Sequence, residues 1–309
     1  MRVLITGAGG FLGRTLATKL HMQHETVAAL VRREPDLPGD IERRFVDIRD
    51  RAALTATVEQ WSPDAIVHLA ALKSIRDSQG NEGDCRATNV DGTTALISAL
   101  KHADPYTHVV FASTVSIYGP QGDPDEGSPT DPRNPYAQSK LEAEQTLLAA
   151  AKTGACRTTI LRLANIAGGF REIYDRDDKP IIPRVLTSAR DGQPVPVNGA
   201  GDSVRDYVHV EDAADAVIAA LQTGPSSPSA LFNVGSGQGA SVTEIITVAE
   251  QITGNPIAVE RKPPVEEVER VVPNVQRIQQ ELGWSPYRSS LARIITDGWE
   301  AMTTTLPDA

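Results

Sequence analysis

Tyr136 and Lys140 have the residue types and spacing of a proton-transfer pair. Pro135 suits the first turn of a helix, and apolar residues at helical spacing continue to about residue 151. The tyrosine and the lysine would then share one helix face. A phenol alone is a poor base near neutral pH because its pKa is about 10, but a neighbouring ammonium favours the phenolate. The pair could therefore exchange a proton with a substrate hydroxyl or carbonyl. Ordinary solvated helices also carry this spacing, so other signals must decide.

A glycine-rich loop near the start of the sequence predicts a nucleotide site. The β-rich run 2–6 leads into Gly7-Ala8-Gly9-Gly10-Phe11-Leu12-Gly13, and apolar residues then recur at helical spacing. A strand, a glycine turn and a helix N-terminus in this order can hold a pyrophosphate. Gly7 permits the tight turn, Gly10 lets the backbone approach phosphate, and Gly13 lets the helix pack on the strand.

The end of the second predicted strand, residues 26–31, bears on the choice of dinucleotide. Such sites usually place an acidic residue here to bind the adenosine ribose, but this chain has Arg32 and Arg33. No carboxylate would repel a 2′-phosphate, and two guanidiniums could bind one, so NADP is favoured over NAD. A solvated basic turn explains the two arginines equally well.

Strands and helices alternate over the first half of the chain. Further strands are predicted at 44–48, 64–71 and 108–113, with helices between them. This order predicts an α/β fold, a doubly wound parallel sheet of the Rossmann type. We expect a dinucleotide-binding domain over 1–165, with later returns near 206–221 and 231–235. A smaller α/β lobe that binds substrate would occupy most of 166–309. His68, inside an apolar strand, is interpreted as a core histidine.

Ligands of such sheets collect at the carboxyl ends of the strands. Lys73 follows the fourth predicted strand and could face cofactor or substrate. Thr114 and Ser116 follow the fifth. A hydroxyl there could bind the same substrate oxygen that Tyr136 protonates or deprotonates, although hydroxyls are also common turn residues.

Six motifs occur together along the chain. They are the glycine loop, Asp47-Ile48, Leu69-Ala70-Ala71, Asn89-Val90-Asp91-Gly92-Thr93, Ser113-Thr114-Val115-Ser116-Ile117-Tyr118-Gly119 and Tyr136-x-x-x-Lys140. Their combination resembles the extended short-chain dehydrogenase/reductases that act on nucleotide sugars. The likeness spans nearly the whole chain and is closest to the UDP-glucose 4-epimerase group of NAD-dependent epimerases and dehydratases. Segments 68–74 and 204–210 look especially like that group.

The resemblance implies a role for three catalytic residues. Thr114 stands where the family has its catalytic serine or threonine, Tyr136 where it has the proton-transferring tyrosine, and Lys140 where it has the lysine that holds the nicotinamide ribose. Dehydration is not expected, because Val115 and Ser116 replace the Asp-Glu pair of the nucleotide-sugar 4,6-dehydratases. The cofactor positions expected from the loop and the likeness are Gly7, Gly10, Phe11, Leu12, Gly13, Arg32, Arg33, Asp47, Ile48, Leu69, Ala70, Ala71, Lys73, Asn89, Tyr136 and Lys140.

Substrate contacts are implied in the second half of the chain. Asn165 and Arg205 match family residues at the nucleotide diphosphate, and a guanidinium fork suits phosphate oxygens. A salt bridge of Arg205 to Asp206 or Asp202 is the alternative. The asparagine that epimerases commonly have near 179–183 is absent. The expected substrate-binding residues are Lys73, Thr114, Ser116, Tyr136, Asn165, Arg205, Arg261 and Arg270, the last two as alternative phosphate ligands.

Composition limits the partners. The formal net charge of −10 over 309 residues argues against nucleic acid or an anionic membrane. Only two cysteines, Cys85 and Cys156, are present, which indicates a reducing compartment and no cysteine metal site, and we expect no metal. No apolar run reaches the ~18 residues of a membrane span. We interpret the chain as cytoplasmic.

These observations predict a nucleotide-diphosphate-sugar 4-epimerase that works on a UDP- or dTDP-hexose through a transient 4-keto sugar. An NADPH-dependent reductase of a nucleotide 4-ketosugar would use the same residues, and Arg32 and Arg33 suit it better. A catalytically inactive nucleotide-binding regulator is a third possibility. The family likeness implies a homodimer through the helices that begin near Asn89 and Tyr136.

Overall fold

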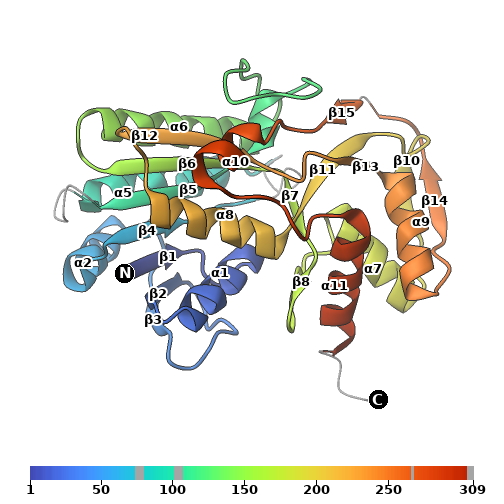
Figure 1. The fold of residues 1–309 in the computed structure, drawn as a ribbon, viewed down its shortest axis with the longest axis horizontal. Helices are drawn as coiled ribbons and strands as arrows, with labels where there is room; N and C mark the ends of the chain where they lie inside the picture. Colours follow the sequence, from blue (N-terminus) through green and yellow to red (C-terminus); the bar gives the residue numbers. More distant parts are fainter. Residues whose placement is uncertain (74–79, 101–106, 266–267, 305–309) are drawn as a thin grey trace.

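A seven-stranded parallel sheet forms the centre of the computed structural model, which describes residues 1–73, 80–100, 107–265 and 268–304 (Figure 1). The strand order is β12-β6-β5-β4-β1-β2-β3, with every pair parallel. The predicted doubly wound sheet is therefore confirmed. The strands are β1 Arg2–Thr6, β2 Thr26–Val31, β3 Glu42–Phe45, β4 Ala65–His68, β5 His108–Thr114, β6 Arg157–Leu163 and β12 Ser229–Val234.

Helices cover both faces of this sheet, which is why its central strands are apolar on both sides. Helices α1 (Phe11–Met22) and α8 (Val210–Thr223) pack on one face around a buried cluster that includes Leu16 and Val217. Helices α2 (Arg51–Trp61), α5 (Gly92–Leu100) and α6 (Pro135–Lys152) pack on the other face. The chain comes back to the sheet through β12, which pairs with β6.

Some element boundaries differ from the predictions. β4 ends at His68, whose partner Thr6 is the last residue of β1, because the chain turns at Gly7 with a φ of +71°. β3 begins and ends earlier than predicted. Because it ends at Phe45, Asp47 and Ile48 follow the strand. The helix expected around Asn89 comprises α4 (Glu82–Arg86), a π-helical turn η1 (Ala87–Asp91) and α5, and its predicted end falls outside the described residues.

A second set of elements surrounds its own apolar cluster, at the opposite end of the molecule from α2 (Figure 1). We refer to this part as the lobe; the predicted boundary at residue 165 stays a prediction. Its central strand β11 pairs with β7 toward its end and with β13 and β15 at its start. The elements are β7 Asn165–Ala167, β8 Gly169–Phe170, β9 Ile173–Tyr174, α7 Ile181–Asp191, β10 Val195–Asn198, β11 Val204–His209, β13 Gly239–Ser241, α9 Val242–Thr253, β14 Val259–Lys262, β15 Arg270–Val271, α10 Gln276–Leu282 and α11 Leu291–Thr304; of these, α10 packs on the main sheet.

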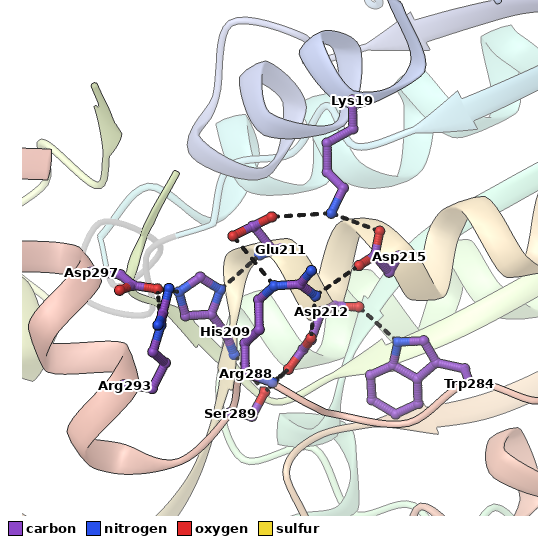
Figure 2. A network of polar contacts seen from close by, with 10 residues as sticks. All are labelled: Lys19, His209, Glu211, Asp212, Asp215, Trp284, Arg288, Ser289, Arg293 and Asp297. Atoms are coloured by element: carbon purple, nitrogen blue, oxygen red, sulfur yellow. Dashed lines mark hydrogen bonds and ion pairs between the residues drawn. The ribbon is translucent and has the colours of Figure 1, made fainter. Parts of the chain in front are cut away.

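A polar network fastens the C-terminal segment to α8 and α1 (Figure 2). The buried carboxylate of Asp212 accepts hydrogen bonds from the backbone N–H of Arg288 at 2.7 Å and the hydroxyl of Ser289 at 2.6 Å. Lys19 of α1 pairs with Glu211 at 3.3 Å and with Asp215 at 2.8 Å. The network therefore joins three segments that are distant in the sequence.

His209, Glu211 and Asp297 place metal-ligand types within 4.8 Å of one another in this network. However, Asp297 pairs with Arg293 at 2.6 Å, and Glu211 pairs with Lys19 at 3.3 Å. Arg293 and Lys19 thus already neutralise the two carboxylates. Their positive charges would repel a divalent cation. We interpret the cluster as an ionic network.

Candidate active site

The glycine loop, the segment after β4 and the segment after β5 meet at one edge of the sheet. They do so because β1, β4 and β5 are adjacent and parallel, so their carboxyl ends lie side by side. The structure thereby brings together the residues predicted to bind cofactor and those predicted to be catalytic. Among the described residues, no helix is both long enough and apolar enough to cross a membrane.

The glycine loop has the shape of a phosphate cradle. A Cβ atom on Gly13 would lie 2.4 Å from the carbonyl oxygen of Gly7, and one on Gly7 would lie 2.6 Å from the backbone nitrogen of Ala70. Helix α1 begins directly after this turn at Phe11, with no side-chain cap. Its first N–H groups and the positive end of its dipole can therefore bind an anion. These features fit a dinucleotide pyrophosphate.

The segment after β4 is fixed by the backbone of β1. Leu69 N–H donates to the carbonyl of Thr6 at 3.1 Å, and Ala70 N–H donates to the Thr6 hydroxyl at 3.2 Å. Lys73 is exposed, and its ammonium lies 3.3 Å from Asp175 and 3.5 Å from Asp177, both in the lobe. The structure thus places Lys73 at the junction with the lobe.

His68 is a core histidine, as predicted. It is 1% exposed, and its ring nitrogens contact the hydroxyls of Thr6 at 2.7 Å and Thr93 at 3.0 Å. Burial, and secondly the charge of Lys140, lower the pKa of His68 to about 3. A neutral ring at neutral pH follows, and both of its nitrogens are occupied.

Thr114 ends β5 and caps a 3₁₀ turn, η2 (Val115–Tyr118). Its hydroxyl accepts from the Ser116 N–H at 3.1 Å and donates to the Ser116 hydroxyl, also at 3.1 Å. The Thr114 hydroxyl also lies close enough to the phenol of Tyr136 to lower the pKa of that phenol. The structure thus brings the two hydroxyls together, and their shared contact with one substrate oxygen stays a prediction.

The protonation of Tyr136 and Lys140 differs from the expectation. Burial raises the pKa of Tyr136 to about 12, and the hydrogen bond with Thr114 only partly opposes this. Burial also lowers the pKa of Lys140 to about 7, although the charge of Glu144 raises it. The expectation that the Lys140 ammonium favours the phenolate is not reflected in these pKa values, because burial disfavours the charged forms of both side chains.

Ser139 of α6 forms a buried cluster with Asn89 and Cys85. The sequence predicted no role for the serine or the cysteine. The Ser139 hydroxyl donates to the carbonyl of Tyr136 at 2.8 Å and accepts from the Asn89 amide at 2.9 Å. It also contacts the Cys85 sulfur at 3.3 Å. Asn89 further exchanges hydrogen bonds with both backbone groups of Leu72, at 2.8 and 3.2 Å. The Asn89 side chain thus fixes the loop after β4 to α6. The position of Ser139, three residues after Tyr136 on the same helix, was the signal in the sequence that could have revealed its contact with Tyr136.

A buried ion pair lies one turn beyond Lys140. Arg162 of β6 binds Glu144 through two nitrogens, at 3.1 and 2.7 Å, and donates to the hydroxyl of Tyr118 at 2.9 Å. Tyr118 in turn donates to Asn233 at 2.7 Å. This chain of contacts locks α6 to β6, η2 and β12, and sequence reasoning missed it because the four residues are far apart in the sequence.

Three of the predicted phosphate ligands of the lobe lie on β11 or on a strand paired with it, and the fourth, Arg261, lies on β14. Arg205 donates to the carbonyl of Val204 at 2.9 Å, while the carboxylate of Asp206 accepts from Ser236 and Gly237. Arg270 lies on the neighbouring strand β15, where it pairs with Asp123 at 3.0 Å. The remaining two predicted ligands are Asn165, which donates to the carbonyl of Asp206 at 3.0 Å, and Arg261, which donates to the carbonyl of Ala200 at 2.7 Å from β14.

A cavity of about 200 Å³ opens in the lobe close to β11. It is lined by both charged and amide side chains, including Lys179, Arg184 and Asn198, together with Ser203 two residues before Arg205. Asn198 of β10 thus lines the same cavity as Lys179, in the segment where the expected asparagine is absent.

The predicted adenosine end lies beyond β2 and β3. Arg32 and Arg33 are exposed. Asp47 pairs with Arg49 at 2.7 Å, and hydrogen bonds from Arg49 lower the pKa of Asp47 to about 2. Ile48 is buried against Gly92.

A doubly wound sheet with a glycine phosphate cradle and a Tyr-x-x-x-Lys helix at its carboxyl edge defines a dinucleotide-binding protein of the dehydrogenase type. The model of the NAD dependent epimerase/dehydratase family matches residues 3–235. The chain belongs to this family.

Relatives match along their whole length. A UDP-glucose 4-epimerase of Streptomyces lividans is 31% identical, with 97% of this chain and 95% of that protein covered. A crystal structure of a UDP-glucose 4-epimerase from Thermotoga maritima with UDP-glucose has a TM-score of 0.91 and 25% identity, covering 99% and 100%. The epimerase structure from Stenotrophomonas maltophila with bound NAD and formylated UDP-arabinopyranose has a TM-score of 0.90 and 28% identity, and 98% of each chain is covered.

Proposed function

We propose that this protein is a nucleotide-diphosphate-sugar 4-epimerase. The observation that carries the proposal is the placement of Thr114 near the phenol of Tyr136, with Lys140 one helical turn away, at the sheet edge that also holds the glycine loop. The full-length similarity to UDP-glucose 4-epimerases supports it.

In the proposed reaction, Tyr136 and Thr114 both bind the oxygen at sugar C4. Tyr136 accepts the hydroxyl proton when the sugar is oxidised and returns it when the transient 4-keto sugar is reduced. The neutral phenol favoured by burial is the form that returns the proton. The neighbouring Thr114 lowers the pKa of Tyr136 and so favours the phenolate, which is the form that accepts the proton. A bound nicotinamide dinucleotide would supply the reversible hydride acceptor. Lys140, beside the ring of Phe111 at 3.9 Å, would hold the ribose and the phenolate charge.

The lobe would hold the nucleotide diphosphate while the 4-keto sugar rotates between the two half-reactions and presents its other face to the cofactor. Asn165 and Arg205 would bind the diphosphate, with Arg261 or Arg270 as a further ligand. The cavity beside Ser203 would receive the rest of the nucleotide, since its amide and cationic groups suit a polar ligand. We propose a UDP- or dTDP-hexose as the substrate class.

For the cofactor we propose NAD at the glycine loop. The related structure from Stenotrophomonas maltophila contains NAD, and the preference for NADP finds no support in the relatives. The exposed Arg32 and Arg33 are the one feature that favours NADP, and with it the alternative of a 4-ketosugar reductase that exchanges its cofactor. Mass spectrometry of the dinucleotide released from denatured protein separates the two. Retained NAD supports the epimerase, whereas empty protein that consumes added NADPH with a keto sugar supports the reductase.

We also propose a cytoplasmic homodimer that pairs through η1, α5 and α6. The basis is the family likeness. Size-exclusion chromatography with light scattering tests the dimer, and a monomer at micromolar concentration would contradict it.

Tyr136→Phe tests the catalytic assignment. The variant should fold and bind dinucleotide, yet lose at least ~100-fold in turnover, because it removes the proton-transferring group. The assay is the equilibration of UDP- and dTDP-hexoses with their C4 epimers. Tyr287→Phe is the matched control, because Tyr287 is 86% exposed. Wild-type turnover in Tyr136→Phe would sink the assignment.

A further inference from the structure

Arg14 is a buried arginine in the first turns of α1, one residue after Gly13. It is 6% exposed, and one guanidinium nitrogen, Nη2, donates to the carbonyl of Tyr174 at 2.9 Å. The other, Nη1, is buried and has no hydrogen-bond partner among the described residues. The carboxylate of Asp36 lies 3.8 Å from it, beyond hydrogen-bond distance. A buried donor in this state is costly, which points to a missing acceptor.

Asp36 stands beside the glycine loop. The residue before it, Pro35, lies 3.6 Å from the position that a Cβ on Gly9 would occupy. The same Asp36 oxygen is 3.6 Å from Nη2 of Arg176, which belongs to the lobe segment after β9. Two guanidiniums therefore converge on one carboxylate that is 69% exposed.

The surrounding charges leave Arg14 without a close anion of its own. Asp175 contributes attraction to Arg14, but its carboxylate lies 3.3 Å from Lys73. Burial, and then the like charge of Arg176, lower the pKa of Arg14. A ligand with several anionic oxygens would satisfy both guanidiniums at once, whereas the single exposed carboxylate satisfies neither at hydrogen-bond distance.

We propose that Arg14 and Arg176 form a guanidinium clamp for the pyrophosphate of the dinucleotide, with Asp36 as an internal competitor that the phosphate displaces. The inference rests on the proposed function, because it takes a dinucleotide at the glycine loop as given. It adds two charged residues to the cradle. One lies on each side of the junction between the main sheet and the lobe. A lobe residue on the cofactor links the lobe to cofactor retention, which an epimerase that recycles its cofactor needs.

The clamp predicts opposite effects for two exposed residues. Arg176→Ala should weaken NADH binding about tenfold, since a charge-assisted hydrogen bond to phosphate is lost. Asp36→Ala should tighten it about threefold or more, because the competing carboxylate is gone. Binding is measured by the fluorescence of NADH titrated into each protein without sugar, after the resident dinucleotide has been removed. The matched controls are Arg190→Ala and Asp40→Ala, which remove exposed members of other ion pairs and should leave the affinity unchanged.

Three ligands besides NADH show which part of the dinucleotide the clamp contacts. ADP-ribose, which retains the pyrophosphate, should follow NADH in both variants, whereas adenosine should bind all proteins alike. Unchanged NADH affinity in both variants would overturn the clamp while leaving the proposed function intact. A loss confined to NADPH would overturn the pyrophosphate assignment in favour of the 2′-phosphate. A wild-type protein that binds neither dinucleotide would instead refute the proposed function itself.

Discussion

At the scale of single residues, burial shifts the pKa values of the candidate catalytic side chains more than their charged neighbours do. Tyr136 and Lys140 lie where their charged forms lose water, so the pKa of the phenol rises to about 12 and that of the ammonium falls to about 7. Uncharged hydrogen bonds also help to position this pair. Ser139 provides these, since it joins the backbone of Tyr136 to Asn89 and, through Asn89, to the loop after β4.

Ser139→Ala should therefore lower kcat about tenfold with KM for the sugar nucleotide unchanged, because it loosens Tyr136 without touching the lobe. Ser188→Ala is the matched control. Ser188 is also a buried helical serine that donates to a backbone carbonyl, but it lies in the lobe. Steady-state kinetics of both variants provide the comparison. Equal losses of kcat in the two would mean that Ser139 acts only on stability.

The burial of His68 predicts a pH effect on stability. Its pKa is about 3 in the folded protein and about 6.5 when unfolded, so the unfolded state binds more protons between these values. Acid in this range should therefore destabilise the fold. His68→Gln removes the group that binds this extra proton in the unfolded state. The free energy of unfolding of the variant should therefore fall less steeply than that of the wild type between pH 7 and 5. Urea denaturation at pH 5, 6 and 7 measures both slopes, and parallel slopes would refute the assignment.

At the scale of elements, close backbone approach at the end of β1 builds the cradle. Gly13 lies against the carbonyl of Gly7, and Gly7 lies against Ala70, so α1, β1 and the segment after β4 are in direct contact. The same approach leaves the first N–H groups of α1 facing the phosphate position.

Gly13→Ala should weaken dinucleotide binding by at least about tenfold and cost about 1–3 kcal/mol of stability, because its Cβ would lie 2.4 Å from a backbone oxygen. Gly39→Ala is the control, since nothing lies within 4 Å of a Cβ there. NADH titration and urea denaturation report the two effects. Wild-type binding in Gly13→Ala would show that the cradle tolerates a larger separation.

At the scale of the whole molecule, the lobe and the sheet are joined by polar contacts to α8. Asp212 is 1% exposed and holds the segment before α11 through Arg288 and Ser289. Asp215, on the same helix, is 34% exposed and makes ion pairs with Lys19 and Arg288.

Asp212→Ala should destabilise the protein by about 2–4 kcal/mol, because it leaves buried donors without an acceptor. Asp215→Ala, which removes a more exposed carboxylate from the same network, should cost less than about 1 kcal/mol. Urea denaturation of both variants measures the difference. A similar small loss in both would show that the Asp212 contacts contribute little.

The family likeness pointed to Thr114 as a catalytic residue. The sequence by itself predicted the alternating strands and helices, the glycine loop and the helical spacing of Tyr136 and Lys140. These follow from local patterns, because hydrophobic period, glycine turns and helical spacing are properties of neighbouring residues. Only the tertiary structure decided which groups are buried and which distant residues meet. Burial raises the pKa of Tyr136, and the contacts of Arg162 with Glu144 and of Arg14 with Tyr174 join residues 18 and 160 positions apart. Such contacts depend on how strands are ordered in the sheet and where the lobe docks, and no short-range pattern encodes that.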